Sequence, residues 1–205
     1  ENNINEFNSN KKIVFEEDID NKLNFESFGN FKNKEFIFNS GKHYFDKNIV
    51  FPKNIDVIIN QNTTLILQKN VSVIFKGSVT VNGTFDNQIY IQSADKTEPF
   101  GVIAAVGNSS KQIDINFLNI ANASEEKIKG RYYSGGLSLY NYKKIRINNL
   151  SINKSKGEDG LNIKYSKECI LSNIKINDSK YDAIDIDNCH TLGENIFLKN
   201  TSNKD

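Results

Sequence analysis

The 205-residue sequence contains no Met, no Trp, two Pro and two Cys. Two Cys do not build a disulfide scaffold, and no second pair of Cys or His has the spacing of a structural zinc site. No apolar run approaches the ~20 residues of a membrane span. The formal net charge is +1, which provides no field to steer the chain to nucleic acid or a membrane surface. We therefore expect no nucleic-acid partner and no insertion in a membrane.

The two cysteines, Cys169 and Cys189, lie about one repeat apart in a repeating part of the chain. This distance favours stacked neighbours in a core. We interpret them as two small buried hydrophobic side chains rather than as a bridge.

What the sequence does contain is an internal repeat in its last third. GGLSLYNYKKIRINNLSINKS begins at Gly135, DGLNIKYSKECILSNIKINDS at Asp159 and DAIDIDNCHTLGENIFLKNTS at Asp182. Each of these rows holds short stretches in which apolar and polar residues alternate, as in half-buried strands. Asn, Ser, Lys and Gly separate the stretches, and Asn tolerates the left-handed backbone of tight turns.

The length of a row limits the architecture. About 23 residues are too few for a strand–helix–strand crossover with its return, and a propeller blade needs roughly 40. No apolar period of ~3.6 residues indicates a helix. The pattern predicts an all-β fold, a right-handed parallel β-helix in which rows stack about 4.8 Å apart. Its inward ladders would be Leu137–Leu161–Ile184, Leu139–Ile163–Ile186 and Leu150–Ile174–Ile196.

The two ends of the chain differ from the repeat. Residues 1–34 are polar and predict an N-terminal arm or cap, in which Phe25, Phe28 and Phe31 would cover the first row. Residues 35–205 predict the β-helix itself. The chain stops soon after a strand-like row with no amphipathic helix to cover it, so we expect that the β-helix is truncated there or that another domain or subunit covers this end.

The stretch from Ser40 to Asp95, together with YSGGLSLY, GEDGLNIK and YDAIDID, resembles a family of bacterial right-handed β-helix domains. Domains of that family often follow a kinase-like domain of the spore-coat-protein-H type, within the pectin-lyase-like superfamily. The resemblance covers roughly residues 36–190. It implies a β-helix fold, a bacterial secreted or cell-surface location and a polysaccharide as partner. The chain lacks the Gly-His-Gly and Arg-x-Lys motifs of polygalacturonases.

Polar ladders should face outward between the apolar ones, because strand side chains alternate. The rows predict two such ladders, Ser138–Asn162–Asp185 and Tyr140–Lys164–Asp187. At the turn before them, stacking places Gly135, Asp159 and Asp182 side by side. Stacking would gather these carboxylates and Glu158 into one acidic patch, overhung by the loop from Glu125 to Ser134. Stacked carboxylates repel one another unless a cation lies between them, which favours a use for the patch.

Three uses fit such a patch. Hard oxygen ligands from successive rows suit Ca²⁺, and we predict Asp159, Asp182 and Asp187 as its ligands. Lyase or epimerase chemistry on a uronic-acid polymer would use Ca²⁺ to neutralise the substrate carboxylate, and Lys164 or Arg131 to handle the proton at C5. Glycoside hydrolysis would use Asp185 and Asp187, roughly 7 Å apart by strand rise, within the inverting range.

From these uses we predict three sets of residues. The catalytic set is Asp182, Asp185, Lys164 and Arg131, and the substrate-binding set is Asn162, Tyr140 and Tyr133, besides the calcium ligands. The alternative is that Asp159 and Asp182 only cap turns and that Lys164 is only the counter-ion of Asp187. We thus expect a domain that binds a carbohydrate polymer, an acidic polysaccharide, with or without cleaving or epimerising it. A non-catalytic structural or adhesion module is the competing class.

Overall fold

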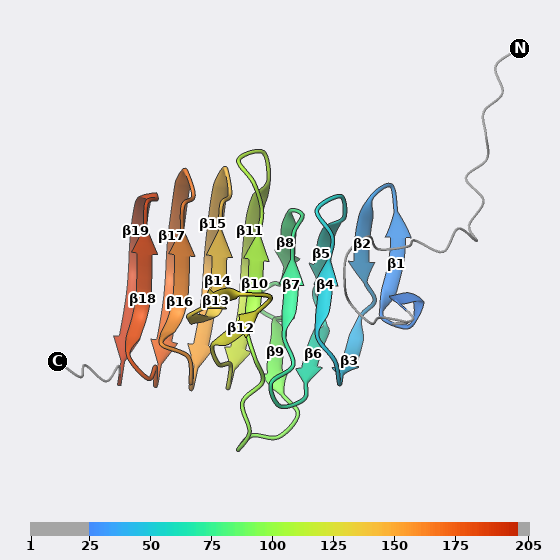
Figure 1. Ribbon diagram of the computed structural model, residues 1–205, viewed down its shortest axis with the longest axis horizontal. Helices are drawn as coiled ribbons and strands as arrows, with labels where there is room; N and C mark the ends of the chain where they lie inside the picture. Colours follow the sequence, from blue (N-terminus) through green and yellow to red (C-terminus); the bar gives the residue numbers. More distant parts are fainter. Residues whose placement is uncertain (1–24, 201–205) are drawn as a thin grey trace, which may run out of the picture.

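The computed structural model describes residues 25–200, and the first 24 residues of the expected arm lie outside this range. Within the range the fold is all-β, as expected, and its helical content is the short 3-10 helix η1 (Phe25–Ser27). The strands form rows that lie side by side along the long axis of the molecule (Figure 1). No helix in this part of the chain is long and apolar enough to cross a membrane.

Six of the strands form one parallel sheet. They are β4 (Ile49–Phe51), β7 (Val73–Phe75), β10 (Ile103–Val106), β14 (Gly135–Tyr140), β16 (Asp159–Lys164) and β18 (Asp182–Asp187). Each strand pairs with the corresponding strand of the preceding row, so Leu137 lies beside Leu161 and Leu161 beside Ile184. The inward ladders expected in these rows are therefore present, in the expected register.

An eleven-stranded sheet forms the rest of each row. Its strands are β1 (Gly29–Lys32), β2 (Glu35–Phe38), β3 (Gly41–Phe45), β5 (Asp56–Asn60), β6 (Thr63–Leu67), β8 (Val79–Asn82), β9 (Ile89–Ser93), β11 (Gln112–Ala121), β15 (Lys144–Asn153), β17 (Glu168–Asn177) and β19 (His190–Lys199). All its pairs are parallel except β1 with β2. The expected ladder Leu150–Ile174–Ile196 is also in register.

Corners within the long strands β15, β17 and β19 explain part of the abundance of Asn. Asn149, Asn173 and Asn195 precede the Leu150 ladder, and their φ angles are 60°, 55° and 53°. This left-handed region is costly for most side chains, and Asn adopts it more readily than most. The same corner recurs in the last three rows with Asn, whereas the row before them has Phe117 there, with φ 50°.

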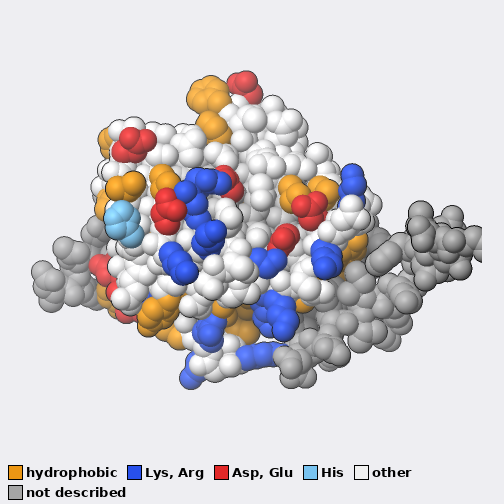
Figure 2. Space-filling view, turned by 90° about the horizontal axis from the view of Figure 1, so that it is seen from above, with side chains coloured by type: hydrophobic (Ala, Val, Ile, Leu, Met, Phe, Trp, Pro, Cys, Tyr) orange, Lys and Arg blue, Asp and Glu red, His pale blue; other side chains and the backbone are white. Residues whose placement is uncertain are grey.

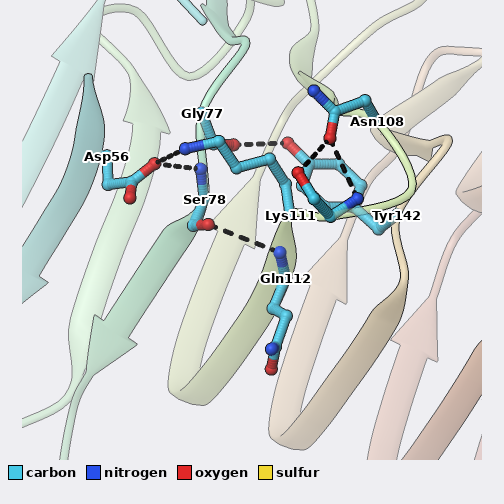
Figure 3. A network of polar contacts seen from close by, with 8 residues as sticks. Asp56, Gly77, Ser78, Asn108, Lys111, Gln112 and Tyr142 are labelled. Atoms are coloured by element: carbon cyan, nitrogen blue, oxygen red, sulfur yellow. Dashed lines mark hydrogen bonds and ion pairs between the residues drawn. The ribbon is translucent and has the colours of Figure 1, made fainter. Parts of the chain in front are cut away.

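A polar network ties four rows together at another corner (Figure 3). Asp56 accepts a hydrogen bond from the backbone N–H of Ser78 at 2.7 Å and pairs with the Lys111 ammonium at 2.6 Å. Tyr142 is fully buried, and its hydroxyl donates to the carbonyl of Gly77 at 2.8 Å. The buried Tyr142 hydroxyl thus finds a backbone acceptor in a different row.

Aromatic side chains close the N-terminal end. Phe25 packs against Phe36 with ring centroids 5.7 Å apart, and Phe28 packs against Phe45 at 4.8 Å. Strand β1 pairs antiparallel with β2 and so changes the direction of the sheet at this end. The described part of the expected cap therefore covers the first row with buried aromatic surface.

The opposite end has no such cover among the described residues. Ile196 and Leu198 continue the inward ladders into β19, but 39% and 49% of their surface is exposed. Leu192 and Phe197 of the same strand are also exposed. That another domain or subunit covers this end stays a prediction.

The interpretation of Cys169 and Cys189 as unbridged is wrong, because they form a disulfide with their Cα atoms 6.2 Å apart. The register explains the error. The neighbour of Cys169 in the next row is Thr191, two residues beyond Cys189. Cys189 therefore lies at the corner before the strand and not directly above Cys169, and this offset brings the two sulfur atoms together.

Candidate functional site

The candidate site lies on the outward face of the last three strands of the six-stranded sheet. Asp159 is in register with Asp182, Asn162 with Asp185, and Lys164 with Asp187. The preceding strand contributes Gly135, Ser138 and Tyr140 to the same three ladders. The register expected for the two polar ladders and for the turn residues before them is thus correct, because parallel pairing keeps each position of a row beside its equivalent.

A hairpin inserted between rows covers part of this face. Its strands are β12 (Glu126–Ile128) and β13 (Arg131–Tyr133), which pair antiparallel in front of the sheet (Figure 1). The ring of Tyr133 stacks on that of Tyr140, with centroids 5.8 Å apart and an interplanar angle of 8°. The loop expected to overhang the patch therefore does so, and it is anchored by aromatic stacking.

Polar contacts hold the base of the hairpin. The Glu125 carboxylate accepts a hydrogen bond from the backbone N–H of Glu158 at 2.6 Å, and the Tyr132 hydroxyl donates to Glu158 at 3.4 Å. Burial, followed by its contacts with Glu125 and Glu158, raises the pKa of Tyr132, so its hydroxyl stays protonated and remains a donor. Through these hydrogen bonds the hairpin contacts the row that carries Asp159.

Between the hairpin and the sheet lies a pocket of about 590 Å³. Its charged lining residues come from the hairpin and two rows: Arg131, Glu158, Asp159, Lys164, Asp182 and Asp185. Its uncharged lining residues are Tyr132, Ser134, Tyr140, Asn141 and Tyr165. A concave site of this size, with convergent polar groups and aromatic rings, has the make-up of a small-ligand site.

Lys164 is the central cation of the site. Its ammonium lies 3.2 Å from a carboxylate oxygen of Asp185 and 3.1 Å from one of Asp187. Burial alone would lower the pKa of Lys164, but the hydrogen bonds and charges of the two carboxylates outweigh it and raise that pKa. Lys164 is therefore a firm cation, and both carboxylates of the expected hydrolytic pair are bound to it.

Asn162 lies below the pocket lining and links the carboxylates of Asp159 and Asp185. It is fully buried, and its side-chain Nδ2 donates to Asp159 at 3.0 Å and to Asp185 at 2.7 Å. Its Oδ1 atom has no hydrogen-bond partner among the described residues. Asn162 was expected to bind substrate, but its position makes it a support that orients two carboxylates of the pocket.

Asp159 differs from the other carboxylates in its burial. Only 3% of its surface is exposed, although it reaches the pocket wall. Burial, with the nearby charges of Asp185, Glu158 and Asp182, raises its pKa to about 6, against a hydrogen bond from Ser134 that lowers it. Asp159 therefore exchanges a proton close to neutral pH, which suits a group that donates or accepts protons.

Most of the residues expected from the sequence meet at this pocket. Asp159, Asp182, Asp185, Lys164, Arg131 and Tyr140 line it. Three expected residues do not line it, for different reasons. Asn162 lies beneath it, Tyr133 is buried in the stack with Tyr140, and Asp187 pairs with Lys164 outside the lining.

Tyr165 is a lining residue that the repeat did not point to. It lies at a corner with φ 56°, equivalent to Asn141 and Asn188 in the neighbouring rows, and 63% of its surface is exposed. A bulky aromatic residue in a left-handed corner is a signal that could have found it, because neighbouring rows place Asn there.

Charges of both signs share the surface of the molecule. Lys and Arg side chains lie among Asp and Glu side chains on the face seen in Figure 2. Within residues 25–200, no group of three or more His, Cys, Asp or Glu side chains is arranged to hold a metal ion. Calcium binding by Asp159, Asp182 and Asp187 stays a prediction.

Comparison of the chain with models of protein families, with curated proteins and with solved structures gave no match. The function is therefore argued from the pocket alone.

Proposed function

We propose that the chain is a right-handed parallel β-helix of the pectin-lyase-like kind that binds a carbohydrate polymer in the pocket under the β12–β13 hairpin. The architecture is supported by the in-register parallel pairing of successive rows in both sheets. Extended parallel rows suit a linear polymer, because they repeat the same surface along the molecule.

The observation that carries this proposal is the composition of the pocket wall. Tyr132 and Tyr165 expose 48% and 63% of their surface there. A sugar ring has an apolar C–H face that packs on an aromatic ring, and its hydroxyl groups form hydrogen bonds with carboxylates and amides. The pocket offers both kinds of contact within one concave surface.

The location follows from the same proposal. The Cys169–Cys189 disulfide supports a bacterial secreted or cell-surface location, because disulfides persist in oxidising compartments.

Isothermal titration calorimetry with neutral, amino and acidic oligosaccharides, the acidic ones with and without Ca²⁺, tests the proposal. We expect at least one class to bind and Tyr165→Ala to weaken binding about tenfold, the loss expected for one stacking contact of ~1.4 kcal/mol. Tyr44→Ala is the matched control, since Tyr44 is equally exposed at 63% but lies outside the pocket. The proposal fails if no class binds, or if the two variants bind alike.

An enzymatic version rests on Asp159, which exchanges a proton near pH 6 and lies in register with Asp182. One carboxyl group held protonated beside a second carboxylate is the arrangement used in glycoside hydrolysis. Lyase or epimerase chemistry with Lys164 or Arg131 is the other version. Incubation with polyuronates, with and without Ca²⁺, separates them. A lyase and a hydrolase both form new reducing ends, but only the lyase also forms an unsaturated end, and an epimerase changes the uronate composition without cleaving the chain.

A non-catalytic structural or adhesion module is the second candidate function. The observation in its favour is that Asp185 and Asp187 are both paired with Lys164, as in a structural ion-pair cluster. Binding without chain cleavage and without a change in the uronate composition supports this candidate.

A further inference from the structure

The charges that line the pocket do not balance. Four carboxylates line it, those of Glu158, Asp159, Asp182 and Asp185, against the two cations Arg131 and Lys164. Asp187 adds a further carboxylate next to the lining, because it shares Lys164 with Asp185. One of the two cations is therefore divided between two carboxylates.

Two neutral donors at the pocket are engaged as well. The Nδ2 of Asn162 donates to both Asp159 and Asp185, and the Tyr132 hydroxyl donates to Glu158. No cation pairs with Asp159 in the described part of the chain, although its side chain is almost fully buried.

Asp182 is the carboxylate that is open to a ligand. It is exposed, it lines the pocket, and its side chain forms no hydrogen bond or ion pair with the residues the structure describes. It is in register with Asp159 on the neighbouring strand. Neighbouring strands lie about 4.8 Å apart, so one small cation between these side chains would contact both carboxylates.

We propose that this pocket recognises an ammonium group, and that its ligand is a polysaccharide of amino sugars whose protonated amine lies between Asp159 and Asp182. This inference rests on the proposed binding of a carbohydrate polymer. An ammonium has three donors, which matches a few carboxylate oxygens and leaves the sugar ring to pack on Tyr165.

Other ligand charges fit the pocket less well. A uronic acid would bring one more carboxylate to a wall that already holds four. Ca²⁺ takes six to eight oxygen ligands. Between Phe25 and Asn200, no cluster of three or more His, Cys, Asp or Glu side chains is arranged to hold a metal ion. An amino sugar needs no bridging ion.

The test uses two oligosaccharides that differ only in the amine. Calorimetry near pH 6.5 compares a glucosamine hexamer with its N-acetylated counterpart, and includes oligogalacturonate with and without Ca²⁺. We expect the hexamer with free amines to bind at least about tenfold more tightly than the acetylated one, as for a charge-assisted hydrogen bond. Asp182→Asn should remove most of this preference. Asp86→Asn, which changes an exposed carboxylate outside the pocket, should leave it unchanged.

Each other outcome overturns the inference in a recognisable way. Equal binding of the free and acetylated hexamers leaves the proposed function standing without the ammonium subsite. Preferred binding of oligogalacturonate with Ca²⁺ favours the calcium site instead. Absence of all binding removes both proposals. If Asp182→Asn matches Asp86→Asn while both variants keep the wild-type melting temperature, the amine is recognised elsewhere.

Discussion

The outward face of the six-stranded sheet has an apolar half and a polar half. In one column the early rows carry Val50, Ile74 and Ala104, and the late rows carry Ser138, Asn162 and Asp185. Both halves have the same parallel backbone pairing. The apolar half packs with Tyr133 and Ile128 of the hairpin, whereas the polar half borders the pocket.

This difference shows that equivalent positions of the same sheet can serve for packing in some rows and for a binding site in others. The ladder hydrogen bonds come from the backbone, so they do not depend on which side chain faces outward. Side chains alone decide whether the face is covered or stays open. The hairpin lies across both halves and therefore makes them into one unit.

The largest effect should come from placing a charge in the apolar half. Ile74 is 4% exposed and packs in the cluster with Val102 and Tyr133. Ile74→Asp would bury an unpaired carboxylate, and we expect a loss of about 3–5 kcal/mol of unfolding free energy in urea titration. Thr64→Asp, on a half-buried outward position of the other sheet beside Lys42, should cost less than about 1 kcal/mol. Similar losses would show that the hairpin does not seal this half.

The next effect concerns the buried carboxyl group of the polar half. The pKa of Asp159 is about 6 in the folded protein and near 3.9 in an unfolded chain. The stabilisation from its protonated form is fully present below about pH 4 and is lost as the pH rises through about 6. Asp159→Asn should abolish this dependence and make the variant more stable than wild type by about 2–3 kcal/mol at pH 7.

Urea titrations at pH 4, 5, 6 and 7 measure this pH dependence. Asp86→Asn, at an exposed position, serves as the control and should follow the wild-type curve. A wild-type profile that is flat between pH 4 and 6 would contradict the raised pKa.

A smaller loss is expected from the amide beneath the pocket. Asn162→Ala removes the hydrogen bonds to Asp159 and Asp185, and we expect the unfolding free energy to fall by about 1–3 kcal/mol at pH 7. Asn82→Ala removes an exposed amide contact of 3.3 Å and should cost less than about 0.5 kcal/mol. If both variants lose the same unfolding free energy, the hydrogen bonds of Asn162 stabilise the protein no more than an exposed amide contact does.

The smallest effect should follow the loss of the central cation. Lys164→Met keeps the apolar stem but removes the charge shared by Asp185 and Asp187. These side chains are partly exposed, so solvent screens the pairs and we expect a loss of about 0.5–1 kcal/mol in urea titration. The loss should shrink in 0.5 M salt. A loss that does not depend on salt would mean that packing of the stem, and not charge, is what Lys164 contributes.

Much of this arrangement could be predicted from the repeat. The spacing of Leu137, Leu161 and Ile184 predicted the all-β class, the register and the two polar ladders, because parallel strands keep equivalent positions together. The overhanging loop was visible as extra length between two rows. The burial of Asn162 was not predictable, since alternation indicates only that it points outward and cannot show that neighbouring side chains cover it.

The disulfide and Tyr165 mark the same limit. Cys189 and Tyr165 both lie at corners, where the alternation of a strand ends. A strand pattern contains no information about the direction of such corners.

The sequence by itself determined which residues stack on which, because the repeat length and the strand period act along the chain and leave one register. The tertiary structure alone decided which stacked residues are accessible. The hairpin covers Tyr140 and the apolar column, Asp185 and Asp187 converge on Lys164, and Asp159 is buried deeply enough to raise its pKa to about 6. The burial of a side chain and the charges around it depend on groups from other parts of the chain. Accessibility and pKa are therefore set only in the folded molecule.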